Sequence, residues 1–67
     1  MEENLREVFA AGKMYKIEMI QQFLTENGIE SFVLNQRGSE FPVGEIRLFV
    51  DEKDEAKAKE IVATHEI

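Results

Sequence analysis

The chain has 67 residues and no cysteine, which suits one small domain and excludes a disulfide framework or a thiolate metal site. Its 14 acidic and 8 basic residues give a formal net charge of −6, and this charge disfavours nucleic acids and anionic membranes, because phosphate groups repel such a chain. No apolar run is long enough to cross a bilayer or to act as a secretion signal. We therefore expect a single domain, residues 1–67, located in the cytoplasm.

The first part of the chain predicts a strand followed by a helix. The segment from Leu5 to Ala10 contains β-branched and aromatic residues and is typical of a strand. From Lys13 to Asn27, apolar residues recur three or four positions apart, a spacing that places them on one face of a helix. Gly28 ends this helix, since glycine readily adopts the left-handed backbone conformation. We interpret Met14 and Met19 as side chains that fill gaps in the core.

The second part predicts two more strands and a second helix. Ile29 to Asn35 and Glu45 to Val50 have the composition or the alternation of strands, and Gln36 to Gly44 between them contains the glycines and the proline of a loop. Asp51 is placed to cap the helix that follows. The buried stripe of that helix is predicted to be Ala58, Ile61 and Val62. The order of elements is therefore β-α-β-β-α.

This order predicts a two-layer α+β domain. The single loop between the second and third strands makes them an antiparallel hairpin. The economical arrangement is a ferredoxin-like half-sandwich with a three-stranded sheet, in which the third strand lies between the other two and both helices cover one face. The outer edge of the first strand and the second face of the sheet then have no cover.

Alternation along the strands predicts which side chains lie on the uncovered face. On the third strand, the alternate residues Ile46, Leu48 and Val50 are strongly apolar and should face the helices. Arg47 and Phe49 should therefore point away from the helices. If Val8 and Ala10 of the first strand face the helices, Phe9 points outward with Phe49.

The second strand leaves two registers open, because apolar residues occupy both of its faces. Either Val33 lies on the uncovered face, or Phe32 and Leu34 do. The small side chain of Ser31 fits beneath a helix and favours the second register. In that register an apolar patch forms on the uncovered face, and monomers seldom leave such a patch in water.

The predicted loop adds Arg37 and Phe41 to these candidates. Arginine and phenylalanine are enriched in protein interfaces, and loops on rigid scaffolds often carry binding residues. The alternative is that Phe41 packs back onto the sheet edge. The full set of candidate interaction residues is Phe9, Phe32, Leu34, Arg37, Phe41, Arg47 and Phe49.

No residue pattern predicts catalysis, a metal or a cofactor. His65 is the only histidine and lies where it would complement the dipole of the second helix. The acidic run from Asp51 to Glu55 lacks the spacing of a calcium loop. No spacing forces two carboxylates together, and neither serine has a nucleophile motif around it.

Four segments of the chain resemble a known family. They are Val8-Phe9 before the first helix, LTENGIES at 24–31, GEIRLFV at 44–50 and DEAKAKEIV at 54–62. Together they look like the family of putative prokaryotic signal-transducing proteins, a domain of unknown function with a fold similar to PII-type nitrogen regulators. The resemblance spans Leu5 to Glu66 and implies a bacterial regulatory or sensing module without catalytic residues.

Two classes of function remain open. The first is a non-catalytic regulatory or adaptor module that binds a protein partner or a small effector. Such a module would self-associate as a homodimer through the open sheet face or the edge of the first strand. The alternative is a small enzyme or enzyme subunit with a pocket at a dimer interface, which Arg47 and Asn35 would line. No cofactor, nucleic acid or membrane is expected among the partners.

Overall fold

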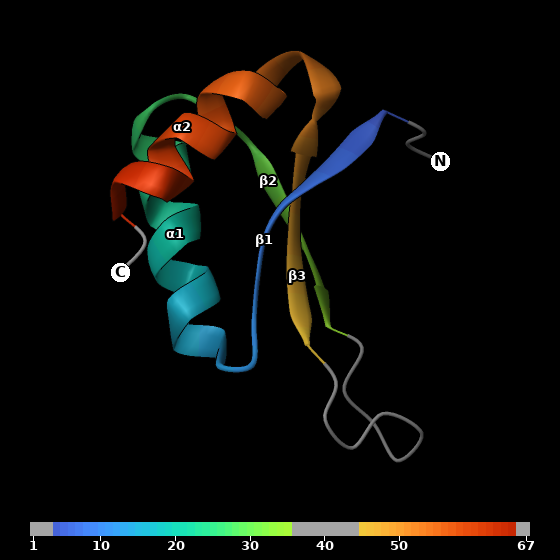
Figure 1. Ribbon diagram of the computed structural model, residues 1–67, viewed down its shortest axis with the longest axis vertical. Coiled ribbons are helices and arrows are strands. Elements are labelled where there is room, and N and C mark those ends of the chain that lie inside the picture. Colours follow the sequence, from blue (N-terminus) through green and yellow to red (C-terminus); the bar gives the residue numbers. More distant parts are fainter. Residues whose placement is uncertain (1–3, 36–44, 66–67) are drawn as a thin grey trace.

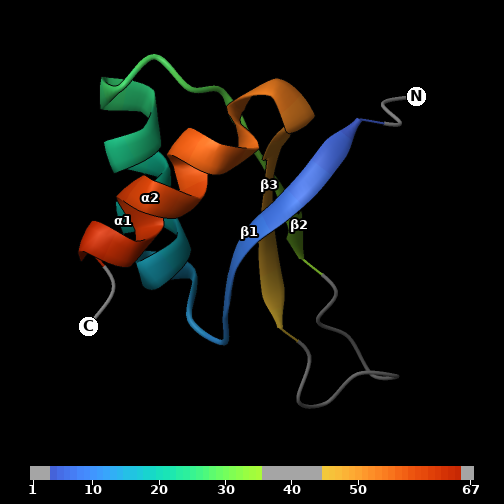
Figure 2. The ribbon, with the colours of Figure 1, turned by 45° about the horizontal axis from the view of Figure 1, so that its top comes forward.

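The computed structural model describes residues 4–35 and 45–65 and has the predicted order of elements (Figure 1). The elements are β1 (Leu5–Ala11), α1 (Met14–Glu26), β2 (Ser31–Asn35), β3 (Ile46–Asp51), a 3-10 turn (Glu52–Asp54) and α2 (Glu55–His65). The strands form an antiparallel sheet in the order β1-β3-β2, and both helices lie on the same side of it (Figures 1 and 2). The ferredoxin-like α+β half-sandwich with the third strand in the centre is confirmed.

Helix α1 ends at the predicted position. Gly28 has a φ of 76°, and its N–H donates to the carbonyl of Thr25 at 2.9 Å. The N–H of Ile29 reaches back to the carbonyl of Leu24, also at 2.9 Å, which completes a Schellman motif. The side chains of Leu24 and Ile29 are both buried, so the turn that ends α1 also directs the chain beneath the helix layer towards β2.

The start of α2 is fixed by a cap and an ion pair. Oδ1 of Asp51 accepts a hydrogen bond from the N–H of Lys53 at 3.0 Å, so the predicted cap is present. It caps a 3-10 turn, and α2 begins only after this turn. Nη2 of Arg6 lies 2.9 Å from Oε1 of Glu52 and connects β1 to the same turn. These contacts hold α2 against the end of the sheet where β1 begins.

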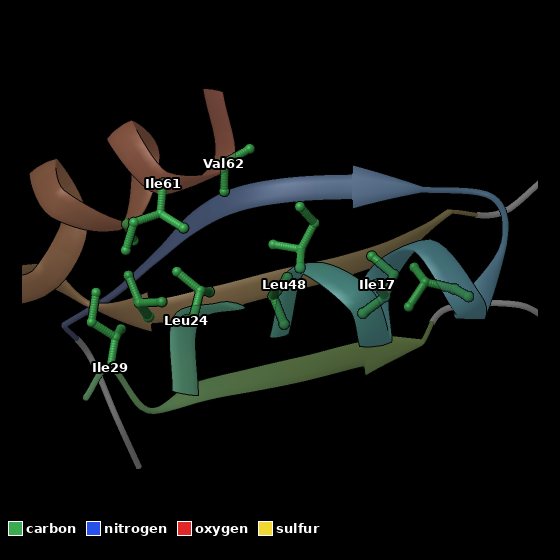
Figure 3. Close-up of a cluster of buried hydrophobic side chains, with 10 residues drawn as sticks. Ile17, Leu24, Ile29, Leu48, Ile61 and Val62 are labelled. Carbon is green, nitrogen blue, oxygen red and sulfur yellow. The ribbon is translucent and has the colours of Figure 1, made fainter. Parts of the chain in front are cut away.

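The core lies between the sheet and the helices (Figure 3). The buried apolar side chains are Ile17, Ile20, Leu24, Ile29, Ile46, Leu48, Val50, Ala58, Ile61 and Val62. The alternate residues of β3 are fully buried, and the stripe predicted for α2 is confirmed. Each fully buried aliphatic side chain of this size stabilises the fold by about 1.5–3 kcal/mol. The central strand therefore contributes a large part of the core as well as both ladders of the sheet.

Strand β1 contains a β-bulge. Glu7 pairs with Phe49 and Phe9 pairs with Leu48, so the intervening Val8 has no partner on β3. In such a bulge two consecutive residues oppose one residue of the neighbouring strand, and the alternation of side chains is interrupted. The interruption moves every later residue of β1 to the face opposite the one that uninterrupted alternation predicts.

The bulge corrects the predicted orientation of two residues. Val8 and Phe9 both pack against the core on the helix side, so the outward orientation predicted for Phe9 is wrong. Ala10 pairs with Arg47 and lies on the uncovered face, so its predicted inward orientation is also wrong. Both errors have one physical cause, since Val8 and Phe9 are adjacent apolar residues and only the bulge lets both of them face the helices.

Candidate functional site

The register of β2 decides which side chains lie on the sheet face opposite the helices, which we call the outer face. Phe32 pairs with Phe49, and Leu34 pairs with Arg47. Val33 between them lies on the helix side, which confirms the favoured register. Phe32 and Leu34 retain 38% and 45% of their accessible surface, because no helix covers this face. The sheet therefore presents apolar side chains from two neighbouring strands to the surroundings.

An ion pair crosses the outer face from β1 to β3. Nη1 of Arg47 lies 3.1 Å from Oε1 of Glu7, and the two side chains are 43% and 39% exposed. Nε of Arg47 is buried and has no hydrogen-bond partner among the described residues. An exposed pair of this kind contributes about 0–1 kcal/mol to stability. Its clearer effect is that the two charges cancel, so the outer face carries opposite charges side by side.

We call this assembly the outer-face patch. Its residues are Leu5, Glu7, Phe32, Leu34, Arg47 and Phe49. Leu5 belongs to it because it lines one hollow together with Phe32 at the end of the sheet where β1 begins. The patch has an apolar part spread over all three strands and one balanced ion pair.

The structure brings together four of the seven residues predicted from the sequence: Phe32, Leu34, Arg47 and Phe49. Phe9 lies on the helix side, as described above. Arg37 and Phe41 lie outside the described residues. Glu7 was missed, although its charge is opposite to that of Arg47. Its place beside Arg47 follows only once the bulge fixes the register of β1 against β3.

A hollow of about 400 Å³ lies where the end of β1, the start of α1 and the last turn of α2 meet. We call it the β1-end hollow. Its apolar side chains include Phe9 and Met19, and its polar ones are Tyr15, Lys16 and His65. None of the described residues that line it is acidic. The hollow therefore differs in charge from the chain as a whole.

The side chains around this hollow correct another prediction. Met19 is 43% exposed and Met14 is 39% exposed, so neither fills a gap in the core. The ring of His65 stacks on that of Phe23, with centroids 3.6 Å apart and planes inclined by 7°. This stack joins the last turn of α2 to α1, and Met14 and Met19 are not part of it.

A second hollow, of about 440 Å³, lies at the opposite end of the sheet. Its charged lining residues are Glu30, Asp51, Lys53 and Asp54. In residues 4–35 and 45–65 no three His, Cys, Asp or Glu side chains gather closely enough to hold a metal ion. One carboxylate, that of Asp51, already accepts the capping hydrogen bond from Lys53. This end of the molecule is acidic, in contrast to the β1-end hollow.

Asn35 and Arg47, the two polar residues predicted to line an enzyme's pocket at a dimer interface, lie on opposite faces of the sheet. Asn35 pairs with Ile46 and lies on the helix side, whereas Arg47 lies on the outer face. Ile46, the partner of Asn35, and Arg47 are consecutive residues of β3 and point to opposite faces. The side chains of Asn35 and Arg47 therefore cannot line one pocket. Neither α1 nor α2 combines the length and the apolar character that crossing a membrane requires.

The family described as "Putative prokaryotic signal transducing protein" matches residues 5–66. The chain belongs to this family. No curated protein and no solved structure matches it. The match covers all three strands and both helices, so the outer-face patch and the β1-end hollow both lie within the matched region.

Proposed function

We propose that the protein is a non-catalytic regulatory module that binds a protein partner, and that two copies meet through their outer-face patches. The observation that carries this proposal is the apolar surface that β2 and β3 expose on the side without helices. The family description supports a role in signal transduction, in which a partner must be contacted. A binding surface made by the sheet itself would supply that contact.

The composition of the patch suits an interface. Phe32 and Leu34 are exposed and lie beside the half-buried Phe49, so their side chains would lose contact with water when a partner docks. Burial of apolar surface contributes about 25 cal/mol for each Å² that is removed from water. Aromatic residues and arginine are also enriched at the centres of protein interfaces. The patch contains both, with Arg47 held by Glu7.

Charge favours a second copy as the occupant of this face. The chain has a net charge of −6, so two copies repel each other over most of their surfaces. On the outer face Arg47 and Glu7 balance each other. A two-fold axis through the patch would place Arg47 near Glu7 of the partner subunit, because such an interface pairs a surface with itself. The pair of Arg47 and Glu7 thus reduces the repulsion between two copies over the part of the outer face that lies away from Asp51 and Asp54.

The size of the face indicates a weak, concentration-dependent contact. The strands have 7, 5 and 6 residues. At about 3.3 Å per residue and about 4.8 Å between strands, the face measures roughly 20 Å by 14 Å, or about 300 Å². Stable interfaces bury about 800 Å² on each partner. Self-association through this face would therefore be transient, which allows a partner with a larger contact surface to displace the second copy.

Analytical ultracentrifugation over a range of about 10 μM to 1 mM tests the proposal. Phe32 and Val33 offer a matched pair, because both are 38% exposed and they point to opposite faces of the same strand. Phe32→Thr should weaken self-association, and Val33→Thr should leave it unchanged, since threonine suits a strand at either position. Leu34→Glu should abolish self-association, because it adds a like charge to both sides of the interface.

Two outcomes would contradict the proposal. If the wild-type protein is monomeric at the highest concentration, the second copy is not the occupant of the outer face. If Val33→Thr weakens association as much as Phe32→Thr, the contact lies elsewhere. Circular dichroism spectra of all variants at low concentration establish that each one is folded before association is compared.

A further inference from the structure

The outer edge of β1 is open along its length. Among the described residues β1 pairs only with β3, so the backbone groups on its other side meet no strand. In folded proteins such edges are commonly protected by charged side chains, bulges or neighbouring segments. Whether each half of β1 has this protection decides where another strand could add.

The first half of β1 is protected and the second half is not. Arg6 and Glu7 place charges in the first half, and the bulge follows directly after Glu7. The second half, Phe9–Ala11, has no charged residue and continues into Gly12. The small side chains of Ala10 and Ala11, and the absence of one at Gly12, let another backbone approach closely.

The unprotected half of β1 lies directly beside the β1-end hollow. Phe9, Ala10, Ala11 and Gly12 all contribute to its wall. Figure 1 shows that β1 passes through a short turn into the first turn of α1, which supplies the opposite wall. A strand that pairs with β1 would direct alternate side chains to the helix side, where this hollow has room of about 400 Å³.

The charges of the hollow indicate the chemistry of such a segment. Lys16 lines the hollow, and Lys13 lies one helical turn earlier, where its carbonyl accepts from the N–H of Lys16. His65 also lines the hollow, and none of the described residues that line it is acidic. In a chain with a net charge of −6, this is a locally basic site. An acidic side chain is its electrostatic complement.

We propose that the second half of β1 and the β1-end hollow bind an extended segment of a partner protein, which adds to the sheet as a fourth strand. One apolar side chain of the segment enters the hollow beside Met19, and an acidic side chain pairs with Lys16. Backbone hydrogen bonds to β1 supply affinity, and the two side chains supply specificity. This site is separate from the outer-face patch and does not depend on self-association.

The probe for the first experiment is an acetylated and amidated peptide of alternating valine and glutamate, matched to the 7 residues of β1. Its control replaces each glutamate with lysine. In two-dimensional amide NMR spectra of the ¹⁵N-labelled protein, the glutamate peptide should shift the signals of Phe9 to Gly12 and of the first turn of α1. The lysine peptide should bind at least tenfold more weakly, as expected for about 1.4 kcal/mol of charge complementarity.

Two variants test the two parts of the site. Gly12→Glu should abolish binding, because it places a negatively charged side chain where the acidic segment adds to β1. The variant should still fold, since a Cβ at this position would meet no atom within 4 Å and the φ is not positive. Gly12→Ala adds only the Cβ and serves as the folding control. Lys16→Glu should weaken binding about tenfold. Lys57→Glu is its matched control, since Lys57 is also an exposed helical lysine and does not line the hollow.

Three results would overturn this proposal. One is equal binding of the glutamate and lysine peptides, and another is the absence of signal shifts with the glutamate peptide at millimolar concentration. The third is a set of shifts centred on Phe32 and Phe49, which would place the peptide on the outer face. Failure of self-association in the ultracentrifuge leaves this proposal unaffected, because none of the variants used there alters the hollow.

Discussion

The bulge in β1 predicts an unexpected ranking of two single-residue deletions. Val8 is the residue without a partner on β3, so its removal still allows Glu7 to pair with Phe49 and Phe9 to pair with Leu48. The strand becomes regular and each remaining side chain keeps its face. The cost is the packing of one half-buried valine, about 1 kcal/mol, compared with a total stability of about 3–10 kcal/mol for a chain of this length.

Removal of Ala10 has a different consequence, although alanine is the smaller side chain. Ala11 pairs with Ile46 immediately before the turn to α1, so the shortened strand must take up the change in the bulge. Val8 then moves opposite Leu48, and Phe9 turns to the outer face. A half-buried phenylalanine ring leaves the helix side, which costs about 2 kcal/mol by comparison with truncations of buried rings.

The two deletions can be ranked by urea denaturation monitored by far-ultraviolet circular dichroism, at a protein concentration low enough to prevent self-association. We expect deletion of Ala10 to lower the free energy of unfolding by about 1 kcal/mol more than deletion of Val8, with similar slopes against urea. In a regular strand, deletion of Val8 would turn Phe9 and Ala11 away from the core. A larger loss for the Val8 deletion would therefore refute the bulge.

Urea denaturation of further variants tests three other local features: the turn at Gly28, the cap by Asp51 and the ion pair of Arg47. Gly28→Ala should destabilise the protein by about 1–2 kcal/mol, because the φ of 76° strains a residue with a Cβ, whereas Gly12→Ala should not destabilise it; equal effects would contradict this account. Asp51→Ala should cost about 1 kcal/mol through loss of the cap on Lys53, and Asp51→Asn should retain most of the stability; if the asparagine variant loses as much, the side-chain cap is not the cause. Arg47→Met should change stability by less than about 1 kcal/mol, since it removes both an exposed ion pair and a buried Nε without a partner; a large loss would show that the pair with Glu7 contributes more than exposed pairs do.

The elements of this fold that follow from the sequence are those with a local physical signal. Asn27-Gly28 ends α1 because the following N–H groups need a left-handed residue to reach back into the last turn. The alternation in β3 predicts its buried face without ambiguity, since polar or aromatic residues separate three aliphatic ones. Ser31 favours the observed register of β2, because its small side chain fits beneath the helix layer.

The errors arise where the sequence has no such signal. Val8 and Phe9 are consecutive apolar residues, and alternation cannot indicate that both face the helices. The exposure of Met14 and Met19 and the stacking of Phe23 on His65 are properties of the tertiary structure, which the spacing of apolar residues does not indicate. The ion pair of Glu7 with Arg47 joins residues 40 positions apart and follows only from the register of the bulged strand.

Strand β3 is the central strand of the described sheet, and β1 and β2 pair with opposite sides of it (Figure 3). A hairpin or a ladder cannot persist after this strand detaches, because the remaining two strands have no bonds to each other. Its amide hydrogens should therefore exchange with solvent only when the whole molecule opens. Any signal that loosens β3 would therefore release both outer strands at once.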